Sequence, residues 1–589
     1  MLTCQLSHPP LSRHGCPPMM CPSGGHGYGC RSATRLRVRV SDTMATGVVV
    51  GRPSSLFLRP TSAINQGLKT CSSSFYRSRR GGGSGGGGSR HHGVGLVRFG
   101  SQSPMLTLRS CLFASANDDA PPHSASRAVI TPSLFSLVVW FARYLEPWNV
   151  MLAMRKEYPD EDILKIDLIF ETFYFLMTPD AAREVLLEKS TDFPLRYSID
   201  LFETLELDRG IVYAQGDRHR TNKRACVPAF ESASSMSTFV EAIRDEVDDM
   251  CDRWVAKIGN KASAQLDVYD EVRQLTLAVV LRVTFGLRSG GSGDKLSNEI
   301  STTIAQYLEA IVACANEPIV SIAPQLSSNY RRVVGSGGLL EKLRRLVLEL
   351  IAERRRVDGV VPTSTVEGGA PPSGDLLGVL LATGASDEDI LLILFDLIIA
   401  GSDTTASTIS ASLLLASKDE RLVSRVREEP DALSVAHEDV RARLPVSTAI
   451  ARETLRLYPP VPFVGRRSVR PSDVCGYSLD EGVVCCWSPF YFGRQFFSSS
   501  VDDAWDPARV WLDGGAGGTT VDPFAWLPFG AGVRGCLGTR LGLTESVLAV
   551  GCMLQRFDFT FERDELTYKY DLTLNLSENR ATACEVRKI

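Results

Sequence analysis

A cysteine set between glycines, just before an expected helix, is the feature that most limits what this chain can fold into. Residues 529–538 read FGAGVRGCLG, with the cysteine at Cys536. Glycines let a backbone bend around the sulfur and approach a flat ligand closely. Residues 537–555 are expected to form a helix, and the free N–H groups at its start would lower the pKa of the thiol. A thiolate presented in this way acts as a metal ligand or a nucleophile, and Arg534 supplies a cation for an anionic cofactor group.

Few other side chains are suited to nucleophilic or zinc chemistry. After His123 the sequence holds only His219 and His437, which disfavours a Ser-His-Asp hydrolase and a histidine-rich metal centre. Six of the 15 cysteines precede residue 118, and the other nine form no CxxC pair and no spacing typical of disulfides. We therefore assign the chemistry of the chain to Cys536.

Helical periodicity dominates the chain from about residue 125 onward. Apolar residues recur three and four positions apart in residues 241–254 and 338–356. Ser386 and Asp389 resemble a capping box. They predict that a long helix spans residues 387–416.

No break in composition argues for a second domain beyond that point. Short β-like stretches bounded by Gly and Pro lie between residues 464 and 487. The basic run at residues 354–356 ends an expected helix, where the helix dipole favours cations, so it indicates a solvated helix end and no nucleic-acid surface. We predict one mainly α domain with a smaller β part over residues 125–589.

The first 117 residues differ from the rest in charge. They carry 13 Arg and one Lys against a single acid, Asp42, which gives +13, so the rest of the chain, whose total is −4, carries −17. An Arg-rich, Ser-rich, acid-poor stretch with a Gly-Ser run buries no core and is typical of an organelle transit peptide. We predict a disordered basic leader over residues 1–117 that directs the chain to a plastid, with a mitochondrion as the alternative. A basic tail without a targeting role, or an internal start at Met44, would give the same composition.

No apolar run in the sequence reaches the roughly 18 residues that span a bilayer. The nearest candidate, residues 133–142 (SLFSLVVWFA), is closed by Arg143. It is expected to be either a helix that makes peripheral contact with a membrane or an ordinary packed helix.

A second motif lies in the middle of the long expected helix, where residues 400–405 read AGSDTT. A helix interior seldom contains Gly, and a Thr hydroxyl can bond to the carbonyl four residues earlier. Gly401 with Thr404 therefore predicts a local widening or kink of the helix. Such a groove is suited to hold dioxygen and water.

A third motif, ETLRLYPPVP, occupies residues 453–462. Glu453 and Arg456 are three positions apart, so they share one helix face and can pair. The proline-rich turn after the pair makes the whole string far more specific than the pair alone.

These three motifs, in this order, resemble the motifs of the cytochrome P450 superfamily, eukaryotic type, over residues 125 to 589. The resemblance implies the cytochrome P450 fold, with haem between the long central helix and the cysteine loop. It implies that Cys536 is the axial thiolate on the iron of haem b (iron protoporphyrin IX). By the same resemblance Phe529 packs beside the thiolate and Arg534 pairs with a haem propionate. Thr404 would take part in oxygen activation, and Asp403 would relay protons from solvent.

Residues 216–224 (GDRHRTNKR) resemble the family's Gly-x-x-Trp-x-x-x-Arg-Arg helix with two departures. His219 stands where Trp is usual and Lys223 where Arg is usual, and both can still donate to a carboxylate. We expect His219 and Lys223 to reach a haem propionate; Arg220 or Arg224 is the alternative.

Two further arginines match family positions. Arg466 corresponds to a propionate ligand of many relatives, and the neighbouring Arg467 is the alternative. The family's later Pro-x-Arg segment matches residues 507–509, which assigns Arg509 to a buried structural network with Glu453 and Arg456. Ala508 replaces the customary Glu of that segment.

The reaction implied is insertion of one oxygen atom from O2 into a small apolar substrate such as a lipid, a fatty acid, a carotenoid or another terpenoid. Electrons would come from a separate donor docking beside the cysteine loop, near Arg534 and Arg540. The donor is a ferredoxin if the chain enters a plastid, and NADPH-cytochrome P450 reductase if it lies on the endoplasmic reticulum membrane. A P450-type isomerase or dehydratase, and a catalytically silent haem-binding protein, are the alternatives.

Overall fold

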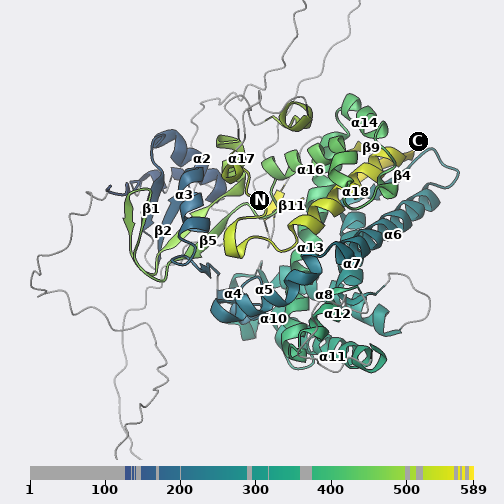
Figure 1. Cartoon of the computed structure of the whole chain (residues 1–589), viewed down its shortest axis with the longest axis horizontal. Helices are drawn as coiled ribbons and strands as arrows, with labels where there is room; N and C mark the ends of the chain where they lie inside the picture. The colour runs from purple at the N-terminus through teal and green to yellow at the C-terminus, as the bar shows by residue number, and fades with distance from the viewer. Residues whose placement is uncertain are drawn as a thin grey trace, which may run out of the picture. The chain divides into compact units, whose positions relative to one another are not determined.

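The computed structural model describes residues 127–589, apart from residues 134, 138, 141–146, 168–170, 199, 288–294, 316, 359–373, 498–503, 513–521, 563–567, 571–573 and 577–582. The predicted leader and the Gly/Pro-rich stretch at 359–373 therefore lie outside the described residues. Within them the chain is mostly helical, with a smaller sheet part (Figure 1).

The helices extend over almost the whole described chain. They are α2 (Pro147–Glu157), α3 (Pro179–Arg183), η1 (Glu184–Glu188), α4 (Asp200–Thr204), α5 (Gly216–Glu231), α6 (Ala233–Ile258), α7 (Val268–Phe285), α8 (Lys295–Ala315), α9 (Pro318–Ile322), η2 (Pro324–Leu326), α10 (Ser328–Val334), α11 (Leu339–Asp358), α12 (Leu376–Ala382), α13 (Asp387–Ala416), α14 (Glu420–Arg427), η3 (Ala432–Ser434), α15 (Val440–Arg443), α16 (Pro445–Leu457), α17 (Pro489–Gln495), η4 (Ala508–Leu512), η6 (Pro523–Ala525), η7 (Gly532–Arg534) and α18 (Thr539–Arg556).

The expected long helix has the predicted bounds. Helix α13 begins after Ser386, whose hydroxyl oxygen accepts a hydrogen bond from the Asp389 N–H at 3.1 Å. It packs against α7, α16 and α18, which makes it the centre of the helical part (Figure 1). The helices predicted at 241–254 and 338–356 are confirmed as parts of α6 and α11.

The strands form one larger sheet and smaller ones. They are β1 (Ile163–Asp167), β2 (Thr172–Leu176), β3 (Leu195–Arg196), β4 (Ala264–Asp267), β5 (Val464–Arg467), β6 (Ser472–Val474), β7 (Tyr477–Leu479), β8 (Val484–Trp487), β9 (Phe557–Phe561), β10 (Tyr568–Tyr570), β11 (Leu574–Leu576) and β12 (Ala583–Lys588).

The larger sheet has the order β1-β2-β8-β5-β3, so strands from both halves of the sequence lie side by side. Only its β2–β8 pair is parallel, and Phe175 lies opposite Cys486. The sheet and helices α2, α3 and α17 share one hydrophobic core, while α6, α7, α13 and α18 form the other. The β-like stretches between 464 and 487 are thus confirmed, as strands β5 to β8.

One helix among the described residues, α13, is long and apolar enough to cross a membrane. Our statement that no run in the sequence is long enough is therefore wrong for α13, although two-thirds of its most apolar window is buried, as in the core helix of a soluble protein. In the 133–142 segment, Leu137 and Trp140 are buried in the sheet-side core while Phe135 is 77% exposed.

Candidate haem site

Glycine conformations shape the loop that holds Cys536. Gly530 and Gly532 have φ angles of +65° and +66°, which favour glycine. A Cβ at Gly532 would also lie 1.9 Å from the carbonyl oxygen of Leu186. The chain then returns so that the Cys536 N–H donates to the Phe529 carbonyl at 2.9 Å. Phe529 thus lies beside the cysteine through its main chain.

Helix α18 begins at Thr539, two residues later than expected, with Cys536 just before its first turn. The N–H of Gly538 lowers the pKa of the thiol, and the Thr539 side chain and the positive charges of Arg196 and Lys223 act in the same direction. The Thr539 hydroxyl donates to the Cys536 main-chain carbonyl at 2.9 Å. Burial is nevertheless the larger effect, and the net pKa of the free thiol is raised. The expected lowering is therefore wrong for the free thiol, because burial disfavours the charged form.

Cys536 is an exposed residue, although the surrounding protein is dense enough for burial to dominate the pKa of its thiol. The side chain is thus accessible at a densely surrounded position. Among the nine cysteines of the described chain it alone is classed as exposed.

Five basic residues from four elements gather near this loop: His219 and Lys223 on α5, Arg466 on β5, Arg534 on η7, and Arg196 on β3. His219, Arg466 and Arg534 are buried. The side chain of Arg466 lies over the ring of Trp487, with 5.0 Å between the guanidinium carbon and the ring centroid. Arg534 donates to the carbonyl oxygens of Ala214 at 2.7 Å and Val212 at 3.4 Å.

Burial, followed by repulsion from neighbouring cations, lowers the pKa values of His219, Arg466 and Arg534. It lowers the pKa of His219 to about 3 and of Arg534 to about 10, and the pKa of Arg466 falls well below its usual value. Arg196 contributes to all three shifts through its charge. Within the described part of the chain, none of the five basic side chains forms an ion pair with a carboxylate. Unpaired buried cations are costly, so this cluster is suited to bind an anionic group.

The structure distinguishes the predicted cations from their alternatives. Arg220 bonds to Asp217 at an exposed site, and Arg224 is also exposed, so both point away from the cluster. Arg467 forms a bidentate pair with Glu171 at 3.1 and 2.5 Å. Arg466 is left to face the cluster.

Lys223 makes contacts that the motif did not predict. Its ammonium group donates to the carbonyl oxygens of Val533 at 2.8 Å and Gly535 at 2.9 Å. It therefore holds the cysteine loop, while the other members of the cluster remain to meet a carboxylate.

The second motif lies on α13 where this helix meets α18. The Thr404 hydroxyl donates to the Ala400 carbonyl at 2.7 Å, as the motif predicted. The α-helical assignment nevertheless continues through Gly401, so any widening there does not break the helix. A Cβ at Gly542 would lie 3.7 Å from the Thr405 hydroxyl oxygen, which places the two helices in close contact one turn after the cysteine loop.

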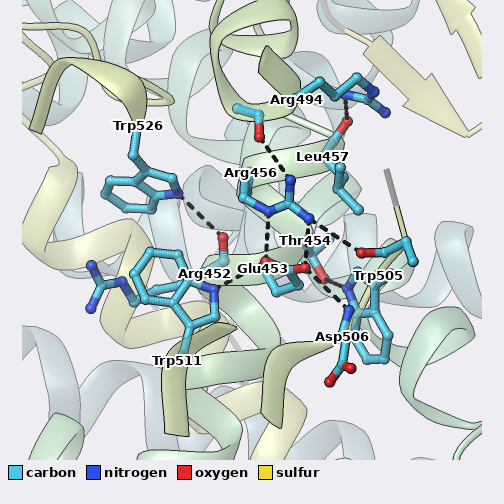
Figure 2. A network of polar contacts seen from close by, with 12 residues as sticks. Arg452, Glu453, Thr454, Arg456, Leu457, Arg494, Trp505, Asp506, Trp511 and Trp526 are labelled. Carbon is cyan, nitrogen blue, oxygen red and sulfur yellow. Dashed lines mark hydrogen bonds and ion pairs between the residues drawn. The ribbon is translucent and has the colours of Figure 1, made fainter. Parts of the chain in front are cut away.

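The third motif forms a buried network (Figure 2). Glu453 and Arg456 pair through two hydrogen bonds of 2.8 Å, and the side chains of both are 0% exposed. Arg456 also donates to the carbonyl oxygens of Gly493 at 2.7 Å and Ala504 at 3.3 Å. Glu453 accepts from the Asp506 N–H at 3.1 Å. The network ties α16 to α17 and to the chain that leads towards the cysteine loop.

Another donor to this network was missed by sequence reasoning. The indole N–H of Trp511 donates to Glu453 at 3.1 Å, and Arg452 stacks on the Trp511 ring with 3.8 Å to its centroid (Figure 2). The side chain of Arg509, predicted as the third partner, lies outside the described residues. Arg196 was also missed, because it lies on a two-residue strand with no motif, and the pairing of β3 with β5 places it opposite Arg466.

The chemistry of this donor set fits a haem. A haem carries two propionate carboxylates, and the buried cations lack a carboxylate partner in the described part of the chain. The accessible thiol of Cys536 is available to ligate iron. Helix α18, which follows the cysteine loop, is in close contact with α13.

The comparisons with known proteins agree. The family model for cytochrome P450 matches residues 131–581. Cyclooctat-9-en-7-ol 5-monooxygenase of Streptomyces melanosporofaciens is 26% identical, covering 75% of this chain and 92% of the relative. Protein LUTEIN DEFICIENT 5, chloroplastic, of Arabidopsis thaliana is 25% identical, covering 66% of each chain. A crystal structure of the cytochrome P450DA heme domain matches 79% of this chain and 98% of its own, with a TM-score of 0.63 and 21% identity.

The chain belongs to the cytochrome P450 family and has its fold, as the sequence predicted. It is a haem enzyme of the P450 monooxygenase class.

Proposed function

We propose that this enzyme binds haem b through Cys536 and inserts one oxygen atom from O2 into an apolar terpenoid or lipid, using electrons from a separate protein. The observation that carries the proposal is the buried cluster of uncompensated cations beside a glycine-shaped cysteine loop. When bound, the haem supplies the iron at which O2 is reduced, with the thiolate donating electron density. The residues of the chain bind and orient this group, and they handle protons.

The propionates are assigned to Arg196, Arg466 and Arg534, with His219 as a neutral hydrogen-bond donor. The low pKa of His219, about 3, leaves its imidazole uncharged at neutral pH, so it offers a single N–H. A bound propionate would reduce the mutual repulsion of the cations and raise their pKa values.

Thr404 and Asp403 are assigned to proton handling. Because the Thr404 hydroxyl donates to the Ala400 carbonyl, its oxygen keeps lone pairs that can accept a further hydrogen bond. Asp403 adjoins it on the same helix and would exchange protons with solvent.

The electron donor is proposed to be an acidic protein such as a ferredoxin. Arg534 is buried and so does not itself form part of the surface beside the loop. Arg540 is exposed, and so are Arg220 and Arg224 on α5, the helix whose Lys223 holds the cysteine loop. A basic surface beside the loop favours an acidic donor.

The substrate class and the compartment follow the named relatives. One relative is named as a monooxygenase of cyclooctat-9-en-7-ol, and another is named as chloroplastic. We accordingly propose a terpenoid substrate and a plastid location, in which a ferredoxin is available.

The test is the absorption spectrum of the reduced carbon monoxide complex. Wild type should show the red-shifted Soret band that a thiolate ligand produces, here called the thiolate band. Cys536→Ala should lose that band, whereas the control Cys226→Ala, at a buried cysteine of α5, should keep it. A thiolate band that survives in Cys536→Ala would refute the ligand assignment.

A further inference from the structure

A buried carboxylate on α13 has no role in the function proposed above. Asp396 lies eight residues, about two helical turns, before Thr404, and it is 4% exposed. One of its oxygens, Oδ2, accepts hydrogen bonds from the N–H groups of Ile211 at 2.6 Å and Val212 at 2.7 Å. Within the described part of the chain it forms no ion pair. Its partners are therefore two consecutive backbone amides of a remote segment.

The segment concerned, residues 210–214, is shaped to approach this carboxylate. A Cβ on Gly210 would lie 2.4 Å from Asp396 Oδ2 and 2.6 Å from the main-chain oxygen of Leu392. Glycine is thus needed at this position for the close approach. The Gly210 carbonyl also accepts from the Asn222 side chain at 2.7 Å, which fixes the start of the segment to α5.

The opposite side of the same segment holds the cation cluster. The Val212 carbonyl accepts from Arg196 at 3.2 Å and from Arg534 at 3.4 Å. The Ala214 carbonyl accepts from Arg534 at 2.7 Å. Asp396 binds the N–H groups of the segment, and the two arginines bind its carbonyl oxygens. One short stretch of main chain therefore connects α13 to the proposed propionate ligands.

Burial removes the Asp396 carboxylate from water, which disfavours its charged form. Burial raises the pKa of Asp396 to about 6, although the two amides and Arg196 oppose the shift. The hydrogen bonds from the two amides offset part of the cost of burying the charge.

We propose that Asp396 is a positioning residue that fixes residues 210–214 and thereby orients Arg196 and Arg534 towards the haem propionates. The step from segment to propionates rests on the proposed function. The step from Asp396 to the segment rests on the hydrogen bonds alone. An experiment can therefore refute either step without refuting the other.

The first measurement is hydrogen exchange at the amides of Ile211 and Val212 in the haem-loaded protein. Asp396→Ala should raise their exchange rate at least about tenfold, since each loses a hydrogen bond to a charged acceptor. Asp396→Asn should remain close to wild type, because a single amide oxygen can replace Oδ2 at both bonds. Ser410→Ala is the matched control: Ser410 is also buried on α13, and its hydroxyl has no partner among the described residues.

The second measurement is the rate of haem transfer to an excess of apomyoglobin. Asp396→Ala should release haem several-fold faster than wild type, with Asp396→Asn and Ser410→Ala close to wild type. Gly210→Ala adds a Cβ that displaces the segment from Asp396, so it should also release haem faster. This variant tests the proposal if Asp396→Ala fails to fold.

The outcomes separate the two proposals. Equal exchange rates in wild type and Asp396→Ala would overturn the anchoring role. Faster exchange with unchanged haem transfer would overturn the link to the propionates. Absence of the thiolate band in wild type would instead overturn the proposed function and leave the exchange result standing.

Discussion

At the scale of single residues, Lys223 shows how one substitution within a motif changes a side chain's role. Its ammonium group lies against the Val533 and Gly535 carbonyl oxygens, so it holds the residue directly before Cys536. The positive charge of Lys223 also lowers the pKa of the Cys536 thiol. A lysine here acts on the thiolate loop, and the propionate contact that the resemblance implies stays a prediction.

We predict that Lys223→Met destabilises the thiolate ligand. The variant loses two hydrogen bonds to the loop and one cation near the sulfur, so a larger fraction of its reduced carbon monoxide complex should lack the thiolate band after mild heating. The comparison is the ratio of the two Soret bands over time, in wild type and variant. Arg224→Met, at the neighbouring exposed position, should behave as wild type. Identical ratios in Lys223→Met and Arg224→Met would contradict this role.

At the scale of elements, the join between α16 and η4 depends on an indole donor. The Trp511 indole N–H donates a hydrogen bond to Glu453 at 3.1 Å, and the guanidinium of Arg452 stacks on the Trp511 ring. We expect Trp511→Phe to lower the free energy of unfolding by about 1–3 kcal/mol, since a buried carboxylate loses a donor. Urea denaturation followed by circular dichroism measures this.

Trp526→Phe is the matched control for that change. The Trp526 indole donates to the Arg452 main-chain carbonyl at 3.3 Å, a neutral acceptor, so its loss should cost less. If both variants lose the same free energy of unfolding, the hydrogen bond to the Glu453 carboxylate contributes no more than the hydrogen bond to a neutral carbonyl.

The buried Asp396 on helix α13 should make the stability of the protein depend on pH. The pKa of Asp396 is raised to about 6 by burial, and the charge of Asp208 adds to the shift while that of Arg196 opposes it. The folded state therefore binds this proton more tightly than the unfolded state. Stability from this group is present at low pH and is lost as pH rises from the ordinary pKa of 3.8 towards 6.

Asp396→Asn removes this titration, so its stability relative to wild type should increase as pH rises from 4 to 6, by up to about 2–3 kcal/mol. Thermal unfolding of both proteins at several pH values gives the comparison. A difference between them that does not change with pH would mean that the carboxyl keeps its ordinary pKa when folded.

Sequence reasoning predicted those parts of the fold and site that are encoded locally. The start of α13 followed from Ser386 and Asp389, because a capping box needs only neighbours in the sequence. Arg196, Trp511 and Asp396 could not be predicted, since each acts through contacts between elements far apart in the chain.

At the scale of the whole molecule, charge is divided unevenly between the predicted leader and the rest of the chain. Residues 1–117 carry +13 and the remainder −17. The family match begins at residue 131, so the match needs none of the leader. Targeting and catalysis should therefore be separable.

We predict that residues 1–117 fused to a fluorescent protein enter plastids of plant or algal cells, with the signal overlapping chlorophyll. Positive charge is the property under test, so the control fusion replaces Arg31, Arg35, Arg37 and Arg39 with Glu and should stay in the cytosol. A second fusion, of residues 44–117, asks whether Met44 begins the functional leader. Diffuse fluorescence from both leaders would contradict targeting. Overlap with a mitochondrial marker would instead place the enzyme in the mitochondrion, and its expected electron donor would then be a mitochondrial ferredoxin.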